Sequence, residues 1–127
     1  DTIEVLVWDA RILDPQAVEK ADVVIADLPC SGLGVIGRKS DIKYRMTSEQ
    51  VADIAALQRE ILSVVWQYVK PGGILMYSTC TLTKAENQDN RDWFLENSPF
   101  TLLEEKELLP SAATDGFYMI KCRRNKA

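Results

Sequence analysis

Apolar residues along the chain fall into two alternating spacing patterns, which predict strands and helices in turn. The runs IEVLVW at residues 3–8 and DVVIAD at 22–27 are short, rich in β-branched residues and almost continuous. Such runs are typical of strands buried on both faces of a parallel sheet. Residues 74–79 and 116–124 predict two further strands, and residues 100–105 predict a weaker one.

Helical spacing appears between these runs. Thr47, with Gln50 three residues later, can form a capping box, and apolar residues then recur every three or four positions. The sequence KPGG at residues 70–73 predicts the end of this helix, because proline and glycine stop helices. A second helix is predicted from about residue 84 to 96, with Trp93 and Phe94 on its buried side.

The order of these elements predicts an α/β fold with a mostly parallel sheet. The length of 127 residues fits one domain. The last strand follows the turn TDG at residues 114–116 without an intervening helix, so it is expected to run antiparallel to its neighbours. Residues 30–46 are expected to form a long loop.

The charged residues give opposing indications about a nucleic-acid partner. The net charge is −4, which counts mildly against a nucleic-acid partner. Four basic residues nevertheless stand close together against one acid, Asp41, giving a local net charge of +3: Arg38, Lys39, Lys43 and Arg45. Taken alone, this cluster is more simply explained as an ordinary solvated charged loop.

The numbers of cysteine and histidine residues limit which metal sites, disulfides and catalytic nucleophiles the chain can contain. Cys30, Cys80 and Cys122 are odd in number and have no C-x-x-C spacing, so neither a disulfide framework nor a zinc site is expected. The chain has no histidine, which excludes an imidazole-activated nucleophile within it. With no long apolar run and no signal-peptide pattern, a cytoplasmic protein without a membrane or metal partner is expected.

Reactive residues follow three of the predicted strands. Asp9 follows the first strand, the segment from Asp27 to Cys30 ends the second, and the segment from Ser78 to Cys80 ends the third. Ligands of open α/β sheets bind beyond the carboxyl ends of the strands, so these residues are expected to converge on one cleft. A single cysteine there is more simply a small buried apolar residue, but two at neighbouring strand ends favour function.

Two thiols with carboxylates suit addition to an electron-poor ring. A thiolate that adds to C6 of a pyrimidine makes C5 nucleophilic, and C5 then attacks an electrophilic methyl group. A carboxylate near N3 and N4 orients cytosine and helps to hold the proton that eases the addition. Composition and spacing alone do not single out cytosine.

Two motifs carry a family resemblance. The stretch DLPCSGLGVIGRKSDIKYR at residues 27–45 resembles the D-A-P-C-S-G-x-G signature of the Nol/Nop/Sun family of RNA cytosine-C5 methyltransferases, with Leu28 in place of alanine. The stretch PGGILMYSTCTLTKAENQDN at 71–90 resembles the family's second signature. Together they cover about a third of the chain. The tail LLPSAATDGFYMIKCRR is most similar to the bacterial Sun (Fmu) branch, whose members modify 16S rRNA.

The resemblance implies a role for each matching residue. It makes Cys80 the nucleophile that attacks C6, Cys30 the second cysteine tied to product release, and Asp27 the carboxylate at the cytosine edge and near the cofactor. Asp9 is implied to contact the adenine side of S-adenosyl-L-methionine, and Pro29 to shape the substrate-binding turn. Four basic residues are implied to meet phosphates of the ribosomal RNA: Arg38, Lys39, Lys43 and Arg45.

One departure from the family concerns the start of the chain. Family members have an RNA-binding region, a first strand with a glycine-rich cofactor loop and a second strand, and none of these precedes residue 3. Residues 1–127 are therefore expected to be the C-terminal part of one catalytic domain. The implied fold is a partial Rossmann-like class I S-adenosylmethionine-dependent methyltransferase fold with its first two strands missing.

This absence has structural consequences. The missing strands normally lie between the third and fourth, so the run at residues 3–8 is expected either to find an unusual partner or to pack loosely. An exposed sheet edge is expected to favour self-association. The piece itself is expected to be inactive and to bind the cofactor weakly.

Two alternatives remain open. The first is a methyltransferase acting on an exocyclic amino group, which Cys30 disfavours because that class has an aromatic residue in its place. The second is a non-catalytic RNA-binding or assembly module that retains the motif residues.

Overall fold

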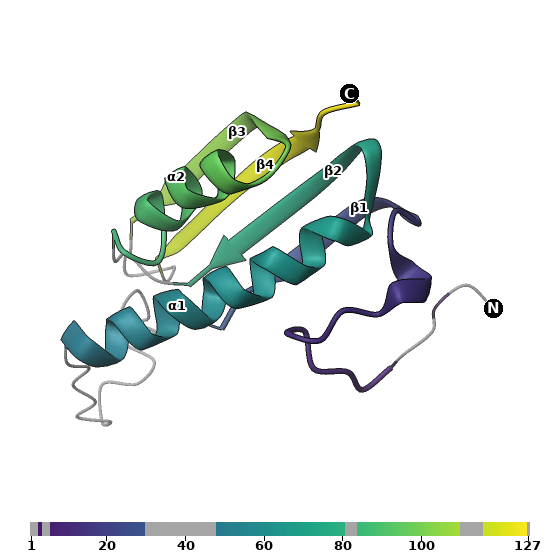
Figure 1. Ribbon diagram of the computed structural model, residues 1–127. Coiled ribbons are helices and arrows are strands. Elements are labelled where there is room, and N and C mark those ends of the chain that lie inside the picture. Colours follow the sequence, from purple (N-terminus) through teal and green to yellow (C-terminus); the bar gives the residue numbers. More distant parts are fainter. Residues whose placement is uncertain (1–2, 4–5, 30–47, 81–83, 110–115, 127) are drawn as a thin grey trace.

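A computed structural model describes residues 3, 6–29, 48–80, 84–109 and 116–126 of the chain (Figure 1). Their elements, in chain order, are a 3-10 turn at Pro15–Ala17, β1 at Ala21–Asp27, α1 at Ser48–Val65, a second 3-10 turn at Trp66–Tyr68, β2 at Val69–Thr79, α2 at Gln88–Asn97, β3 at Phe100–Leu108 and β4 at Phe117–Arg124.

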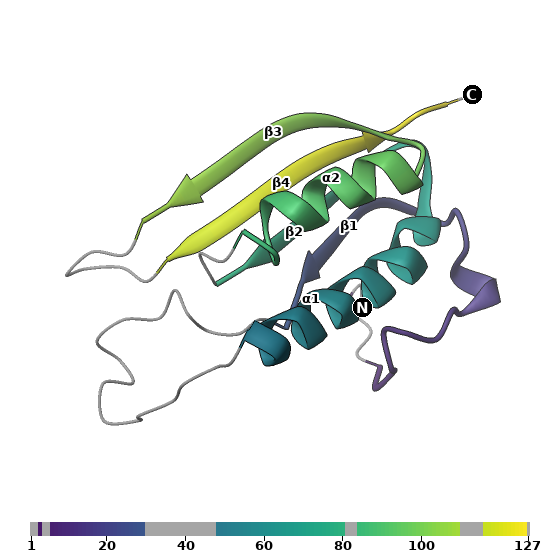
Figure 2. The same ribbon diagram turned by 60° about the vertical axis from the view of Figure 1, so that its left-hand side comes forward.

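The four strands form one sheet in the order β1-β2-β4-β3. β1 pairs with β2 in parallel, whereas β4 is inserted antiparallel between β2 and β3. Three strands therefore point the same way and only the last runs against them, as Figure 2 shows. This confirms the predicted α/β class and the antiparallel last strand.

Both helices cover the same face of the sheet (Figures 1 and 2). Buried side chains from α1, α2 and all four strands meet there, among them Leu62, Leu75, Phe94, Phe100 and Ile120. The rings of Phe94 and Phe100 are 5.1 Å apart. Full burial of each such side chain contributes about 1.5–3 kcal/mol, so this single layer between helices and sheet is the main source of stability.

The opposite face of β1 is not covered by any element that the structure describes. Val23 is 53% exposed and Ile25 is 72% exposed, whereas Ala26 on the helical side is buried. The prediction that β1 is buried on both faces is therefore wrong. Its run of β-branched residues signals two apolar faces, but only one of them has a packing partner here.

The strand predicted at residues 3–8 is absent from the described part of that segment. Residue 3 and residues 6–9 have no strand pairing, and Leu6, Val7 and Trp8 are exposed. Apolar alternation supplies a strand's side chains, but a strand forms only when a neighbour supplies its hydrogen bonds. The loose packing expected for a run without its neighbours is what the structure shows.

The junction between α1 and β2 also differs from the prediction. The helix gives way to a 3-10 turn after Val65, and β2 begins at Val69, ahead of the KPGG sequence. Ala21 pairs with Val69 and Val23 with Ile74, so residues 70–73 bulge out of the ladder. Gly72 has a φ of 85°, and a Cβ on Gly73 would lie 2.8 Å from the backbone oxygen of Asp22.

Other boundaries shift by smaller amounts. The second helix begins at Gln88, after a turn at residues 84–87, and β3 extends to Leu108. Trp93, expected on the buried side, is only partly buried and lies 5.5 Å from the guanidinium of Arg59. Thr47 lies outside the described residues, so the predicted capping box stays a prediction.

Candidate active site

The carboxyl ends of β1 and β2 lie side by side because these two strands are parallel. Asp27 is in register with Ser78, whose Oγ donates to Asp27 Oδ1 at 3.4 Å. The backbone N–H of Leu28 donates to the carbonyl oxygen of Ser78 at 3.0 Å. Cys80 follows two residues later and is exposed. The structure thus brings a carboxylate and an exposed thiol to one sheet edge.

Asp9 does not end a strand, contrary to expectation. It is exposed, and its carboxylate accepts hydrogen bonds from the backbone N–H of Arg11 at 2.9 Å, from Nε at 3.0 Å and from Nη2 at 2.7 Å. These hydrogen bonds, with the charge of the guanidinium, lower the pKa of Asp9 to about 2. Arg11 engages both oxygens of the carboxylate that was expected to contact adenine.

Pro29 is held through its backbone. Its carbonyl oxygen accepts a hydrogen bond of 2.6 Å from Nε2 of Gln58, a fully buried residue of α1. The neighbouring Leu28 is buried, which anchors the backbone just after β1. The other site residues predicted in this part of the sequence lie outside the described residues: Cys30, Arg38, Lys39, Lys43 and Arg45.

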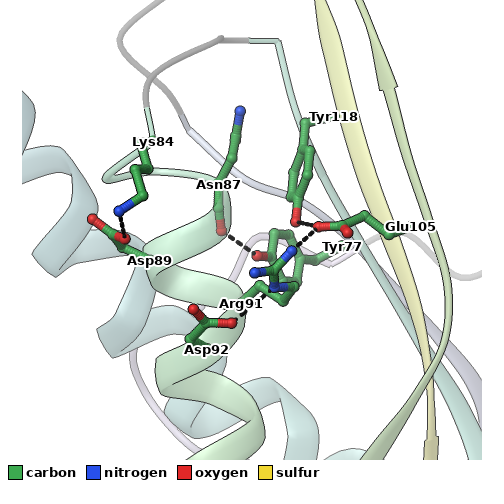
Figure 3. Close-up of polar contacts among 8 residues, drawn as sticks. All are labelled: Tyr77, Lys84, Asn87, Asp89, Arg91, Asp92, Glu105 and Tyr118. Carbon is green, nitrogen blue, oxygen red and sulfur yellow. Dashed lines mark hydrogen bonds and ion pairs between the residues drawn. The ribbon is translucent and has the colours of Figure 1, made fainter.

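The turn at residues 84–87 lies against the core. Glu86 and Asn87 are fully buried although both are polar. Thr79 Oγ1 donates to Asn87 Oδ1 at 2.6 Å. The Tyr77 hydroxyl donates to the Asn87 carbonyl oxygen at 3.2 Å, as Figure 3 shows. These bonds fasten the turn at residues 84–87 to the end of the cysteine-bearing strand.

Gln58 joins the two halves of the site. Besides Pro29, its Nε2 contacts Glu86 Oε1 at 3.2 Å, and its Oε1 accepts from Asn90 Nδ2 at 2.8 Å. Sequence reasoning missed this residue. The signal was present, because Gln58 lies three residues after Ala55 and four before Leu62, in the buried stripe of α1. A polar residue in such a stripe needs buried hydrogen-bond partners.

A second polar group holds α2 against the sheet. Arg91 Nη1 donates to Glu105 Oε2 at 2.5 Å, and the Tyr118 hydroxyl donates to the same carboxylate (Figure 3). Burial and the adjacent Glu105 raise the pKa of Tyr118, and burial raises that of Tyr77. Both phenols therefore stay neutral donors near neutral pH, and the helix that follows the Glu86–Asn87 turn is fixed in place.

The third thiol belongs to the core. Cys122 on β4 is fully buried, and burial raises the pKa of its thiol to about 12. Within the described ranges, no group of His, Cys, Asp and Glu side chains is arranged to hold a metal ion. In the same part of the chain, no helix combines the length and apolar character needed to cross a membrane.

Comparison with known proteins identifies close relatives. The family described as 16S rRNA methyltransferase RsmB/F matches residues 1–122. Ribosomal RNA small subunit methyltransferase B of Vibrio cholerae is 41% identical over 128 residues, which covers 92% of this chain and 29% of that protein. The chain therefore spans less than a third of the length of this curated relative.

Solved structures agree with this relationship. The crystal structure of PH0851 is 34% identical with a TM-score of 0.85, covering 94% of this chain and 30% of that one. NSun6 from Pyrococcus horikoshii with SFG is 24% identical with a TM-score of 0.78, covering 98% and 35%. The fold is thus part of the class I S-adenosylmethionine-dependent methyltransferase fold, and the chain belongs to the RsmB/F family of 16S rRNA methyltransferases.

Proposed function

We propose that the protein containing this chain methylates C5 of a cytosine in 16S rRNA through a covalent bond between Cys80 and C6. One observation carries the proposal. Asp27 and the segment that leads to Cys80 lie at adjacent carboxyl ends of parallel strands, within a chain of a 16S rRNA methyltransferase family. That edge is where open α/β sheets bind their ligands.

The residues divide the chemistry between them. The Cys80 thiolate adds to C6, forming an S–C6 bond and moving the electron pair of the C5–C6 double bond to C5, which takes up the methyl group. The Asp27 carboxylate accepts a hydrogen bond from the N4 amino group and so orients the ring. We assign Cys30 to take up the C5 proton, after which the S–C6 bond breaks and Cys80 is regenerated.

S-adenosyl-L-methionine, when bound, would supply the electrophilic methyl group and leave as S-adenosyl-L-homocysteine. The described residues fit this cofactor only in part. Asp27 lies at the ligand-binding edge, but Arg11 engages both carboxylate oxygens of Asp9. A contact between Asp9 and adenine therefore requires the carboxylate to leave Arg11. We further propose that the basic residues at 38–45 contact RNA phosphates and that the enzyme works in the cytoplasm, beside its ribosomal substrate.

Thiol substitutions in the full-length protein test the mechanism. Cys80→Ala is expected to abolish methylation of 16S rRNA, whereas Cys30→Ala is expected to accumulate an RNA–protein adduct that survives denaturing electrophoresis. Cys122→Val, which removes a buried thiol away from the sheet edge, serves as the control for loss of a cysteine. Full activity of Cys80→Ala would refute the covalent route.

We also propose that residues 1–127 form the C-terminal part of one catalytic domain. The chain spans 29% of its Vibrio cholerae relative, and β1 leaves an edge and an apolar face uncovered among the described elements. The isolated chain is then a non-catalytic module that binds the cofactor weakly and self-associates. Tight cofactor binding in calorimetry, or a monomer at high concentration in sedimentation, would contradict these two expectations.

A further inference from the structure

We propose that Gln58 is a positioning residue, which holds the backbone at Pro29 and the turn at residues 84–87 in a fixed arrangement. The inference rests on the proposed function, because these two segments lie next to Asp27 and Cys80, the residues assigned above to hold and attack the base. Gln58 itself lies on α1, in neither signature motif. Its amide is the group that touches both segments.

The geometry places Gln58 between the motifs. Its Nε2 donates to the Pro29 carbonyl oxygen at 2.6 Å, one residue before Cys30. The same nitrogen contacts Glu86 Oε1 at 3.2 Å, in the turn that follows Cys80. These partners are 29 and 28 residues away in sequence, so neither contact follows from local structure.

Burial makes this amide hard to replace. Gln58, Glu86 and Asn90 are all fully buried, and Asn90 Nδ2 donates to Gln58 Oε1 at 2.8 Å. One amide thus serves two acceptors and one donor. A glutamate side chain has no N–H to donate to the two acceptors, and a leucine side chain can bond neither the acceptors nor the donor. Loss of a buried partner costs its neighbour the full desolvation penalty, so the two segments would move to find new partners.

Such movement reaches the reacting groups. Pro29 is two residues from Asp27, and Asn87, next to Glu86, is bonded to Thr79, the residue before Cys80. A change in the Gln58 bonds therefore alters the distance between the base-holding carboxylate and the attacking thiol. Misplacement of about 1 Å lowers a catalytic rate about 100-fold. Gln58 contacts neither RNA nor the cofactor in the proposed mechanism, so KM values are expected to change less than kcat.

Two variants that exchange the amide and the carboxylate between residues 58 and 86 distinguish an effect on kcat from an effect on stability. In Gln58→Glu of the full-length enzyme, two carboxylates face each other and the Pro29 oxygen loses its donor. Adding Glu86→Gln restores a donor–acceptor pair between residues 58 and 86, and Asn90 still donates to residue 58, but Pro29 stays without its donor. We expect the double variant to regain thermal stability while kcat stays about 10- to 100-fold below wild type, with KM values within about threefold.

Two controls complete the experiment. Gln67→Glu makes the same substitution at a solvent-exposed hydrogen bond, in which Gln67 Nε2 donates to the Ser63 carbonyl oxygen at 2.8 Å. This variant is expected to keep full activity. Leu62→Ala destabilises the same helix without removing a polar contact and should keep kcat within about threefold. The inference is overturned if the double variant has wild-type kcat, or if Leu62→Ala loses as much kcat. An inactive wild type would instead refute the proposed function.

Discussion

The buried hydrogen bond between Thr79 and Asn87, next to the proposed nucleophile, allows a test of how much burial adds to the free energy of unfolding. Thr79 is the last residue of β2 and is fully buried, and its Oγ1 donates to Asn87 Oδ1 at 2.6 Å. Thr79→Val replaces the hydroxyl by a methyl group of similar size. Valine and threonine are both β-branched and favour strands, so the change affects mainly this hydrogen bond.

The expected magnitude follows from the environment of the acceptor. Removing one partner of a buried pair costs about 1–3 kcal/mol, because the remaining group keeps its desolvation penalty. The chain contains a matched control. Thr101 on β3 donates to Asn125 Oδ1 at 2.8 Å, but this pair is exposed and water can replace the lost donor. Thr101→Val is expected to change the free energy of unfolding by at most about 0.5 kcal/mol.

Urea denaturation of both variants and wild type measures the difference. We expect the midpoint of Thr79→Val to fall well below that of Thr101→Val, with the same dependence on urea concentration for all three proteins. If the two variants differ in unfolding free energy by less than about 0.5 kcal/mol, the buried hydrogen bond stabilises the fold no more than the exposed one, and the reasoning is wrong.

The remaining predictions concern the bulge and the thiols. Gly73→Ala is expected to cost about 1–3 kcal/mol in urea denaturation, because its Cβ meets a backbone oxygen at 2.8 Å; unchanged stability would show that the bulge yields easily. Iodoacetamide at neutral pH, followed by mass spectrometry, should label exposed Cys80 much faster than buried Cys122, and equal rates would contradict the core assignment. Because burial raises the pKa of Cys122 from 9.0 to about 12, the unfolded state loses this proton first, so stability should fall as the pH rises through that range. Cys122→Val should remove this decline between about pH 9 and 10. An identical decline in the variant would show that the Cys122 thiol is not its cause.

The sequence by itself determined the parts of this protein that depend on short-range patterns. The spacing of apolar residues is enough to predict α1 and α2, since each helix forms its hydrogen bonds within its own segment. The strand patterns with intervening helices predict that β1 and β2 are parallel, and thereby that Asp27 and Cys80 approach one sheet edge. The two signature motifs also identified the family.

Only the tertiary structure decided the features that depend on a distant partner. The run at residues 3–8 has the composition of a strand but no described neighbour to pair with. The buried bonds of Gln58 join residues 28 to 32 positions apart, and no local spacing encodes which turn meets which helix. Such contacts form only once the sheet and its helices have assembled, because a buried amide gains its partners from whatever chain the packing brings to it.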